Sequence, residues 1–400
     1  MDWQKLSYNI RNNPFILPIY LPSMLFAVCQ GLIVPILPLY LVEFGVSYWL
    51  VGLVIGGEGL GMLLGDVPSG MIVSRLGKKR AMWIGITCSA LATAALFWTN
   101  TALLAFLCRL VSGLGVALFN ISRYAYLAEG AERAKRGRAI AIFGGVARIG
   151  RFAGPAVGGF IASFYGLRSP FLLYFVLSGI AIVLILIFVK RTYSTATLNH
   201  QSHFETLLQI LGQHYQILIR AGAGQMLAQT IRAGRAVIIP LYASEIIGLD
   251  VSLIGLIISI AAAVDMVLFP VAGYVMDHWG RKFSIIPCFS IQAIGMILVS
   301  VSGGFASLLF ASIVIGFGNG LGSGTMMTLG ADLSPEESRG EFLGVWRLIG
   351  DTGHSGAPIV VGGIANLIGL PMGAIAMAVA GFTSAAIFAF LVPETLRKNQ

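Results

Sequence analysis

The fold is decided by GMIVSRLGKK at Gly70–Lys79 and by GYVMDHWGRK at Gly273–Lys282, two stretches that lie 203 residues apart. Both have glycine at the first and eighth positions and basic residues at the ninth and tenth. A single register kept along the chain indicates two related halves. The same offset matches Gly113 with Gly316, Glu129 with Asp332, Arg136 with Arg339, Gly137 with Gly340, Gly150 with Gly353 and Pro155 with Pro358.

The repeated stretches stand among long apolar blocks. The chain has 57% hydrophobic and 11% charged residues, whereas about a quarter of the residues of a soluble domain are charged. The blocks are roughly 18 to 28 residues long, which suits a helix that crosses a ~30 Å hydrocarbon core. Because backbone groups in lipid must be satisfied within the segment, we predict an all-α integral membrane protein. About twelve helices are expected, at 14–42, 50–73, 81–98, 102–127, 139–164, 170–189, 217–247, 253–276, 283–301, 306–329, 342–367 and 372–392.

A polar connection separates the two sets of six helices. We predict an N-terminal six-helix bundle at 1–190, a cytoplasmic linker at 191–214 and a C-terminal six-helix bundle at 215–400. The first apolar block lacks a small-residue cleavage site, so it is expected to be retained as a span. The four cysteines lie in apolar spans without paired spacing, which indicates neither disulfides nor a metal site.

The basic residues indicate how the chain lies in the membrane. The formal net charge is +9, and most of the 26 Lys and Arg fall on the side shared by both termini. Only Arg168 lies in a loop on the opposite side. By the positive-inside rule both termini are expected in the cytoplasm, in a multi-pass protein of the plasma membrane. The positive charge therefore sets topology, and nucleic acid is not an expected partner.

The two repeated stretches resemble the loop signature G-x-x-x-D-[RK]-x-G-[RK]-[RK] of the major facilitator superfamily. The second copy keeps Asp277, whereas the first has Ser74 at that position, and His278 replaces a basic residue. The resemblance implies two pseudo-symmetric six-helix bundles and alternating access. It also implies a gate motif whose charges lock helix ends in one conformational state, although a basic loop that only sets topology is the alternative. This motif comprises Gly70, Arg75, Gly77, Lys78, Lys79, Gly273, Asp277, Gly280, Arg281 and Lys282.

Shorter elements are similar to those of twelve-span drug:proton antiporters. Arg109 with Gly113 and Gly115 resembles an R-x-x-x-G-x-G element of proton-driven efflux proteins. GLIVPILP at 31–38 and the tail PET at 393–395 also fit this branch. A fifth-span element resembles an antiporter motif, and its small residues would equally serve simple helix packing. This helix-packing motif comprises Gly150, Gly154, Pro155, Gly158 and Gly159.

Several ionisable residues lie at membrane depth. On an insertion scale, six arginines facing lipid would cost on the order of 15 to 20 kcal/mol, so they must face a cavity or a partner. Carboxylates in such a site can change protonation with their surroundings. The proton-coupling candidates are Arg109, Glu58, Asp265 and Asp351, and the substrate-cavity candidates are Arg232, Arg235, Gln225, Gln229, Arg148, Arg151, Arg347 and His354.

Depth along the helices predicts which of these residues meet. Arg148 or Arg151 is expected to pair with Asp265, either as a static pair or as one that breaks between states. The polar stripe that carries Arg232 and Arg235 could bind an anionic head group or pair with Glu58. His354 is expected to be a hydrogen-bonded packing residue rather than a proton site.

These features predict a secondary active transporter of a small organic solute, working by alternating access as a proton-coupled exporter. The cavity arginines support an alternative, uptake or facilitated diffusion of an organic anion, and a non-transporting receptor of the same fold is a third. No protease or hydrolase motif, P-loop or filter sequence is recognisable, so an enzyme, a pump or a channel is not expected. We expect no cofactor or metal, a proton gradient as driving force, and a monomer in the bilayer.

Overall fold

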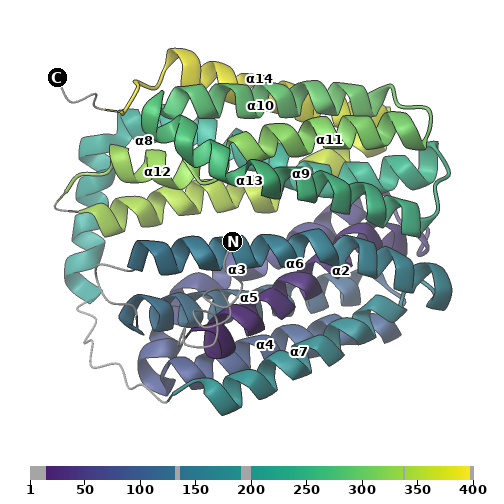
Figure 1. Cartoon of the computed structure of the whole chain (residues 1–400), viewed down its shortest axis with the longest axis horizontal. Helices are drawn as coiled ribbons and strands as arrows, with labels where there is room; N and C mark the ends of the chain where they lie inside the picture. Colours follow the sequence, from purple (N-terminus) through teal and green to yellow (C-terminus); the bar gives the residue numbers. More distant parts are fainter. Residues whose placement is uncertain (1–14, 131–135, 191–199, 337, 397–400) are drawn as a thin grey trace, which may run out of the picture.

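The computed structural model describes residues 15–130, 136–190, 200–336 and 338–396. Within these ranges the chain is helical almost throughout and contains no strand. The helices form two bundles that lie side by side with roughly parallel axes, one from each half of the sequence (Figure 1). The predicted all-α fold of two six-helix halves is therefore confirmed.

The first bundle contains six helices long enough to span a membrane. Gly77, which has a φ of 78°, separates the second helix from the third and permits the tight reversal between them. The elements are η1 (Ile16–Tyr20) continuing into α2 (Leu21–Val42), α3 (Tyr48–Leu76), α4 (Lys78–Ala95) with the short turn η2 (Leu96–Trp98), α5 (Ala102–Gly130), α6 (Arg136–Tyr165) and α7 (Ser169–Phe188).

The second bundle repeats this order with one difference. Its fourth span is broken at residues 322–324, where Gly324 adopts a left-handed φ of 82°, whereas α5 in the first bundle is continuous. The elements are α8 (His200–Leu241) with η4 (Tyr242–Ile246), α9 (Val251–His278), α10 (Arg281–Ser300), α11 (Phe305–Leu321), α12 (Thr325–Leu333), α13 (Arg339–Ile368) and α14 (Leu370–Phe390). Because α8 begins at His200, inside the stretch taken as linker, the domain limits stay predictions.

Hydropathy distinguishes three of these helices from the others. Among the described residues, nine helical segments are long and apolar enough to cross a membrane by length and composition alone. The long helices α6, α8 and α13 are not among them. Each carries charged residues within its predicted membrane span, among them Arg148 and Arg151, Arg232 and Arg235, and Arg347 and Asp351. The helices least suited to lipid are those expected to line a cavity.

The gate motif forms a matched set of contacts, here called the clamp, at the linker end, where α3 and α9 finish and α8 begins. Lys78 pairs with Glu129 in the first half, and their equivalents Arg281 and Asp332 pair at 2.9 Å in the second. The helix ends are joined in the same way. Lys79 Nζ donates to the Leu186 carbonyl at 2.7 Å, and Lys282 Nζ donates to the Ala389 carbonyl at 2.8 Å. The 203-residue offset relates every member of this clamp.

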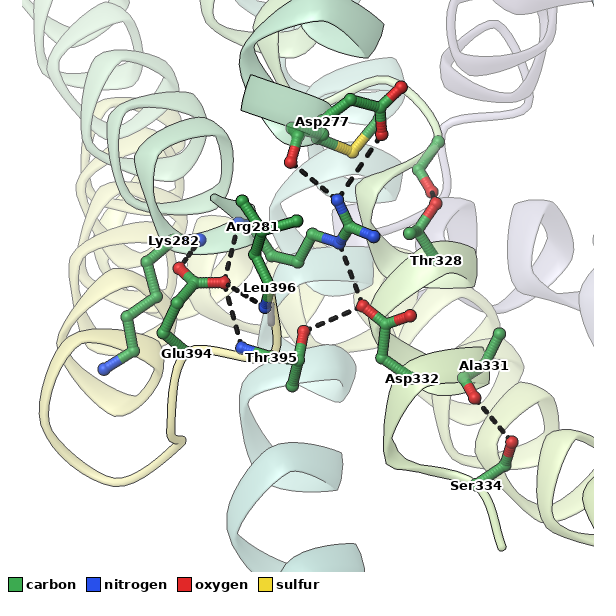
Figure 2. A network of polar contacts seen from close by, with 12 residues as sticks. Asp277, Arg281, Lys282, Thr328, Ala331, Asp332, Ser334, Glu394, Thr395 and Leu396 are labelled. Atoms are coloured by element: carbon green, nitrogen blue, oxygen red, sulfur yellow. Dashed lines mark hydrogen bonds and ion pairs between the residues drawn. The ribbon is translucent and has the colours of Figure 1, made fainter. Parts of the chain in front are cut away.

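The second copy of the clamp has additional contacts (Figure 2). Arg281 also lies 3.4 Å from Asp277, whereas Ser74, at the equivalent position in the first half, donates to the Met71 carbonyl of its own helix. Glu394 accepts from the backbone N–H groups of Arg281 and Lys282 at 2.9 and 3.0 Å. The family-like tail therefore caps the start of α10, where a carboxylate also suits the positive end of the helix dipole.

Glu394 gives this cap a pH dependence. Burial alone would raise its pKa, but four backbone N–H donors lower the pKa below its usual value. The unfolded chain therefore binds the proton more tightly, so the cap contributes stability above about pH 4 and loses it as the pH falls further. We expect Glu394→Gln to lower the free energy of unfolding near neutral pH by about 1 kcal/mol or less, since the carboxylate is partly exposed.

Thermal unfolding of Glu394→Gln and the parent protein at neutral and acidic pH would measure this effect. The difference in melting temperature should shrink in acid. A difference that stayed constant across the range would exclude a role for the ionised carboxylate.

The predicted helix-packing motif of α6 packs against α2. A Cβ at Gly154 would lie 2.6 Å from Gly31 Cα, and a Cβ at Gly150 would lie 2.5 Å from Ala27 Cβ. Gly159 instead faces the other half, where a Cβ would lie 2.5 Å from the Val251 carbonyl oxygen. The small residues thus permit close packing both within the first bundle and between the bundles.

Candidate transport site

A cavity of about 400 Å³ lies between the two bundles. Eight helices contribute to it, four from each half, because its lining residues lie on α2, α3, α5, α6, α8, α9, α11 and α13. Most of the lining is apolar, and the polar and charged members come from both halves. These are Gln30, Glu58, Arg109, Arg148, Arg151, Arg232, Arg235, Asp265, Ser312, His354 and Ser355.

The two bundles touch closely at the end of the molecule opposite the linker. A Cβ at Gly52 of α3 would overlap the Pro358 carbonyl oxygen of α13. Ser163 of α6 donates to Asp250, which precedes α9, at 3.1 Å. Towards the linker end, an added Cβ at Gly70, Gly144, Gly273 or Gly344 would meet no atom within 4 Å. The two halves are therefore in close contact at the far end of the molecule.

Glu58 of α3 and Arg109 of α5 form an ion pair at the cavity wall. Their side chains are 14% and 6% exposed, so both charges are largely removed from water. Gly113 brings the two helices together, because a Cβ there would overlap the Glu58 carbonyl oxygen. In the R-x-x-x-G-x-G element, the arginine thus pairs with Glu58 and the first glycine allows the close packing of the two helices that carry the pair. The hypothesis that Glu58 pairs with Arg232 or Arg235 is wrong, since Arg109 occupies it.

Asp265 of α9 is the centre of a second polar network. Arg148 of α6 places Nη1 3.3 Å from both carboxylate oxygens, so the predicted pair across the two halves is present. Asn319 donates to one oxygen at 3.0 Å and Ser323 donates to the other at 3.2 Å. The guanidinium of Arg148 also stacks on Phe269, 4.4 Å from the ring centroid. Asp265 is therefore held by its own bundle as well as by the opposite one.

Arg232 extends this network to the broken helix. Its Nε donates to the Asn319 side-chain oxygen at 3.0 Å, and its Nη2 donates to the Gly322 carbonyl at 3.1 Å. The guanidinium also lies 5.1 Å from the centroid of Phe289. The break between α11 and α12 frees carbonyl groups from helical hydrogen bonds, which explains why a cation can bind there.

Loss of Asp265 is expected to cost more than loss of Arg148. Asp265→Asn would leave Arg148 without its carboxylate and would weaken the position of Asn319 and thereby of Arg232. We expect this change to reduce stability by about 3 kcal/mol, as for a broken buried pair. Arg148→Gln should cost about 1 to 2 kcal/mol, because Asn319 and Ser323 still hold the carboxylate.

Thermal unfolding in detergent would compare the two single variants with Arg220→Gln, which removes an exposed arginine from α8. Equal losses for Asp265→Asn and Arg148→Gln would contradict the central position assigned to Asp265.

Arg347 of α13 joins two carboxylates at the linker side of the cavity. It lies 3.2 Å from Asp351 on its own helix and 3.5 Å from Asp66 of α3 in the other half. Arg347, predicted as a cavity residue, does not line the cavity, and neither does Asp351, which was predicted as a proton-coupling residue. They are placed one to two helical turns closer to the linker end than His354, and there they hold the two bundles together.

The structure corrects three other expectations. Gln225 is buried against Gly350 of α13 and does not line the cavity, and Gln229 is also absent from the lining. The polar face of α8 that lines the cavity therefore begins only at Arg232. The part of α8 nearer the linker end faces α13 instead. His354, a cavity candidate that was expected to serve as a hydrogen-bonded packing residue rather than a proton site, lines the cavity with an exposed side chain.

Four residues with notable contacts in the structure were not predicted from the sequence. Asp66 satisfies the same criterion of charge at membrane depth as the chosen candidates, so that criterion could have found it. Asn319 and Ser323 are uncharged, and only the glycine-rich stretch around them hinted at an unusual helix. Arg123 lies 4.8 Å from the ring centroids of both Phe119 and Phe143, an arrangement that no spacing in the sequence indicated.

Two related bundles around a shared cavity define a multi-pass membrane transporter, and known proteins agree. The family model described as Major Facilitator Superfamily matches residues 19–227 and 221–400, so the chain belongs to this superfamily and is a transporter rather than an enzyme. It is 24% identical over 344 residues to the uncharacterized MFS-type transporter MJ1560 of Methanocaldococcus jannaschii, which covers 85% of this chain and 88% of that protein.

One further relative and one solved structure extend the comparison. Multidrug resistance protein 2 of Bacillus subtilis is 23% identical over 292 residues, covering 71% of this chain and 72% of that protein. A crystal structure of the nucleoside transporter NupG, in a mutant form, superposes with a TM-score of 0.77 at 16% identity, over 94% of this chain and 99% of that one. The structural likeness supports the fold, and the predicted family is confirmed.

Proposed function

We propose that the chain exports a small organic solute across the plasma membrane by alternating access, driven by a proton gradient. The observation that carries this proposal is the cavity shared by both bundles, which lies between halves that touch closely at the far end and is lined by paired carboxylates. A cavity between two halves that are in close contact at one end is what one of two alternating states requires. A monomer suffices, because one chain supplies both bundles.

The carboxylates supply the proposed coupling. Glu58 is paired with Arg109 inside one half, and Asp265 is paired with Arg148 across the two halves. Protonation of either acid would release its arginine, and movement of the halves would change the surroundings of Asp265 directly. Asp351 and Asp66 share Arg347 and form a third group of this kind, the second that joins the two halves.

Direction and orientation rest on separate observations. A relative named as a multidrug resistance protein supports export. The linker end carries the clamp and its basic residues, so by the positive-inside rule we assign it to the cytoplasm. The described cavity would then belong to an inward-facing state, which takes its solute from the cell.

Proteoliposomes with an imposed pH gradient would test the coupling, after thermal stabilisation has identified a solute that binds. Solute should accumulate on the more acidic side, and dissipating the gradient should abolish accumulation. The matched variant Glu58→Gln should exchange solute but fail to accumulate it. Flux that ignored the gradient in both directions would reject coupling and favour facilitated diffusion, the alternative.

A further inference from the structure

The charges of the cavity do not balance. Its lining contains five arginines and two carboxylates. Glu58 is occupied by Arg109, and Asp265 is occupied by Arg148 with Asn319 and Ser323. Arg232 is held by Asn319 and by the Gly322 carbonyl at the helix break. Within the part of the chain that the structure describes, Arg151 and Arg235 remain without an acidic partner.

These two arginines come from opposite halves and line the same cavity. Arg151 lies on α6, and its Nε reaches only the Ala147 carbonyl of its own helix at 3.5 Å. Arg235 lies on α8 of the other half, one turn beyond Arg232. Two guanidinium cations that line one cavity at membrane depth repel each other, so an anion between them would be favoured.

The surroundings of the pair specify the remainder of the ligand. Branched apolar residues from both halves line the same cavity, among them Ile33, Leu37, Ile55, Ile239, Ile258 and Ile315. The volume of about 400 Å³ falls within the range of pockets that hold drug-sized molecules. Guanidinium groups match the geometry of carboxylates and phosphates through paired hydrogen bonds.

We propose that the cavity binds an amphiphilic organic anion whose carboxylate, sulfonate or phosphate head group lies between Arg151 and Arg235. This inference rests on the proposed transport function and names its substrate class. The head group would touch both bundles and would replace the repulsion between the two cations by attraction to a shared anion. Binding would thus favour approach of the two halves around the solute.

Three isosteric probes test the proposal by titration calorimetry on the purified full chain in an uncharged detergent at neutral pH. They are 2-naphthoate, neutral 2-naphthamide and cationic 2-naphthamidine, which share one apolar body and differ in charge. We expect naphthoate to bind at least about 10-fold more tightly than the amide, and the amidine to bind most weakly.

The variants Arg151→Gln and Arg235→Gln should each weaken naphthoate binding by about 10-fold and leave amide binding unchanged, which also shows that the cavity is intact. Arg235→Lys should retain part of the preference, since it keeps the charge. The matched control Arg220→Gln removes an exposed arginine from α8 outside the cavity lining and should change nothing. No binding of naphthoate, a preference for the amidine, or an unchanged preference in both glutamine variants would overturn the proposal.

Failure of this inference can be distinguished from failure of the proposed function. If the amidine bound best and accumulated in proteoliposomes along a pH gradient, coupled transport would stand and the anion site would be wrong. If naphthoate bound with the expected preference but crossed the membrane independently of the gradient, the site would stand and proton coupling would be wrong.

Discussion

Arg109→Ala is expected to reduce gradient-driven transport by at least about 100-fold and to lower the free energy of unfolding by about 3 to 5 kcal/mol. The change leaves Glu58 in a largely dry site without its counter-charge. The carboxyl group would then be held in its protonated form, because a lone carboxylate is strongly disfavoured there. A group that cannot release its proton cannot couple transport to a gradient.

The double variant Glu58→Gln/Arg109→Gln separates the two effects. It removes both charges, so most of the lost stability should return, whereas gradient-driven accumulation should remain absent. Thermal unfolding and transport in proteoliposomes measure the two quantities independently. Coupled transport within about twofold of the parent in Arg109→Ala would show that the pair has no part in coupling.

Gly52→Leu is expected to open the far end of the molecule. Any side chain at this position overlaps the Pro358 carbonyl of the opposite half, and that backbone atom cannot move independently of α13. Overpacking of this kind costs about 1 to 3 kcal/mol, and about 2.6 kcal/mol is enough to move an equilibrium from 1:9 to 9:1. A state in which the far end is open would lack this contact, so we expect it to become populated while transport falls about 10-fold.

Spin labels at Thr101 and Gly303, exposed residues at the far ends of the two bundles, would report this change as a longer distance. Gly356→Leu is the matched control, because an added Cβ at Gly356 of α13 meets no atom within 4 Å. The control should keep both the distance and the transport of the parent. If Gly52→Leu left the label distance unchanged, the contact would not hold the far end closed.

Internal similarity allowed much of the fold to be predicted. The offset that matched Lys78 with Arg281 and Glu129 with Asp332 also predicts equivalent neighbours, and the structure pairs them in the same way. Equivalent residues in related halves occupy equivalent places, so a repeat carries information on contacts. Depth along a helix was similarly sufficient to propose the pair of Arg148 with Asp265.

The depth of a residue along its helix was not sufficient to predict the other contacts of the site, because the rotation of each helix about its own axis was unknown. Glu58 lies at a depth in the membrane at which several arginines are within reach. It pairs with Arg109 because Gly113 allows α5 to pack closely against α3. Gln225 was assigned to the cavity by its spacing from Arg232, yet the rotation of α8 buries it against α13. Rotation follows from packing across the whole bundle, which a pattern along one helix does not contain.

The difference between the halves is clearest at the broken span. The 203-residue offset places Gly322, Ser323 and Gly324 opposite Phe119, Asn120 and Ile121 of the first half. Because α5 is continuous there, the similarity of the halves predicted a continuous helix in the second half as well. Glycine at two of these three positions favours an interruption, and comparison of the halves residue by residue would have revealed it.

Because of this break, α12 is a short helix separate from α11 and can move as a rigid unit. The nine-residue helix is about 14 Å long. One end adjoins Ser323 and Gly322, which bind Asp265 and Arg232 in the cavity. The other end carries Asp332, which binds Arg281 of the clamp at the linker end. Protonation of Asp265 would weaken its hydrogen bond to Ser323 at one end of α12. A shift of α12 as a rigid helix would then change the contact of Asp332 with Arg281 at its other end, without any change in the helices around it.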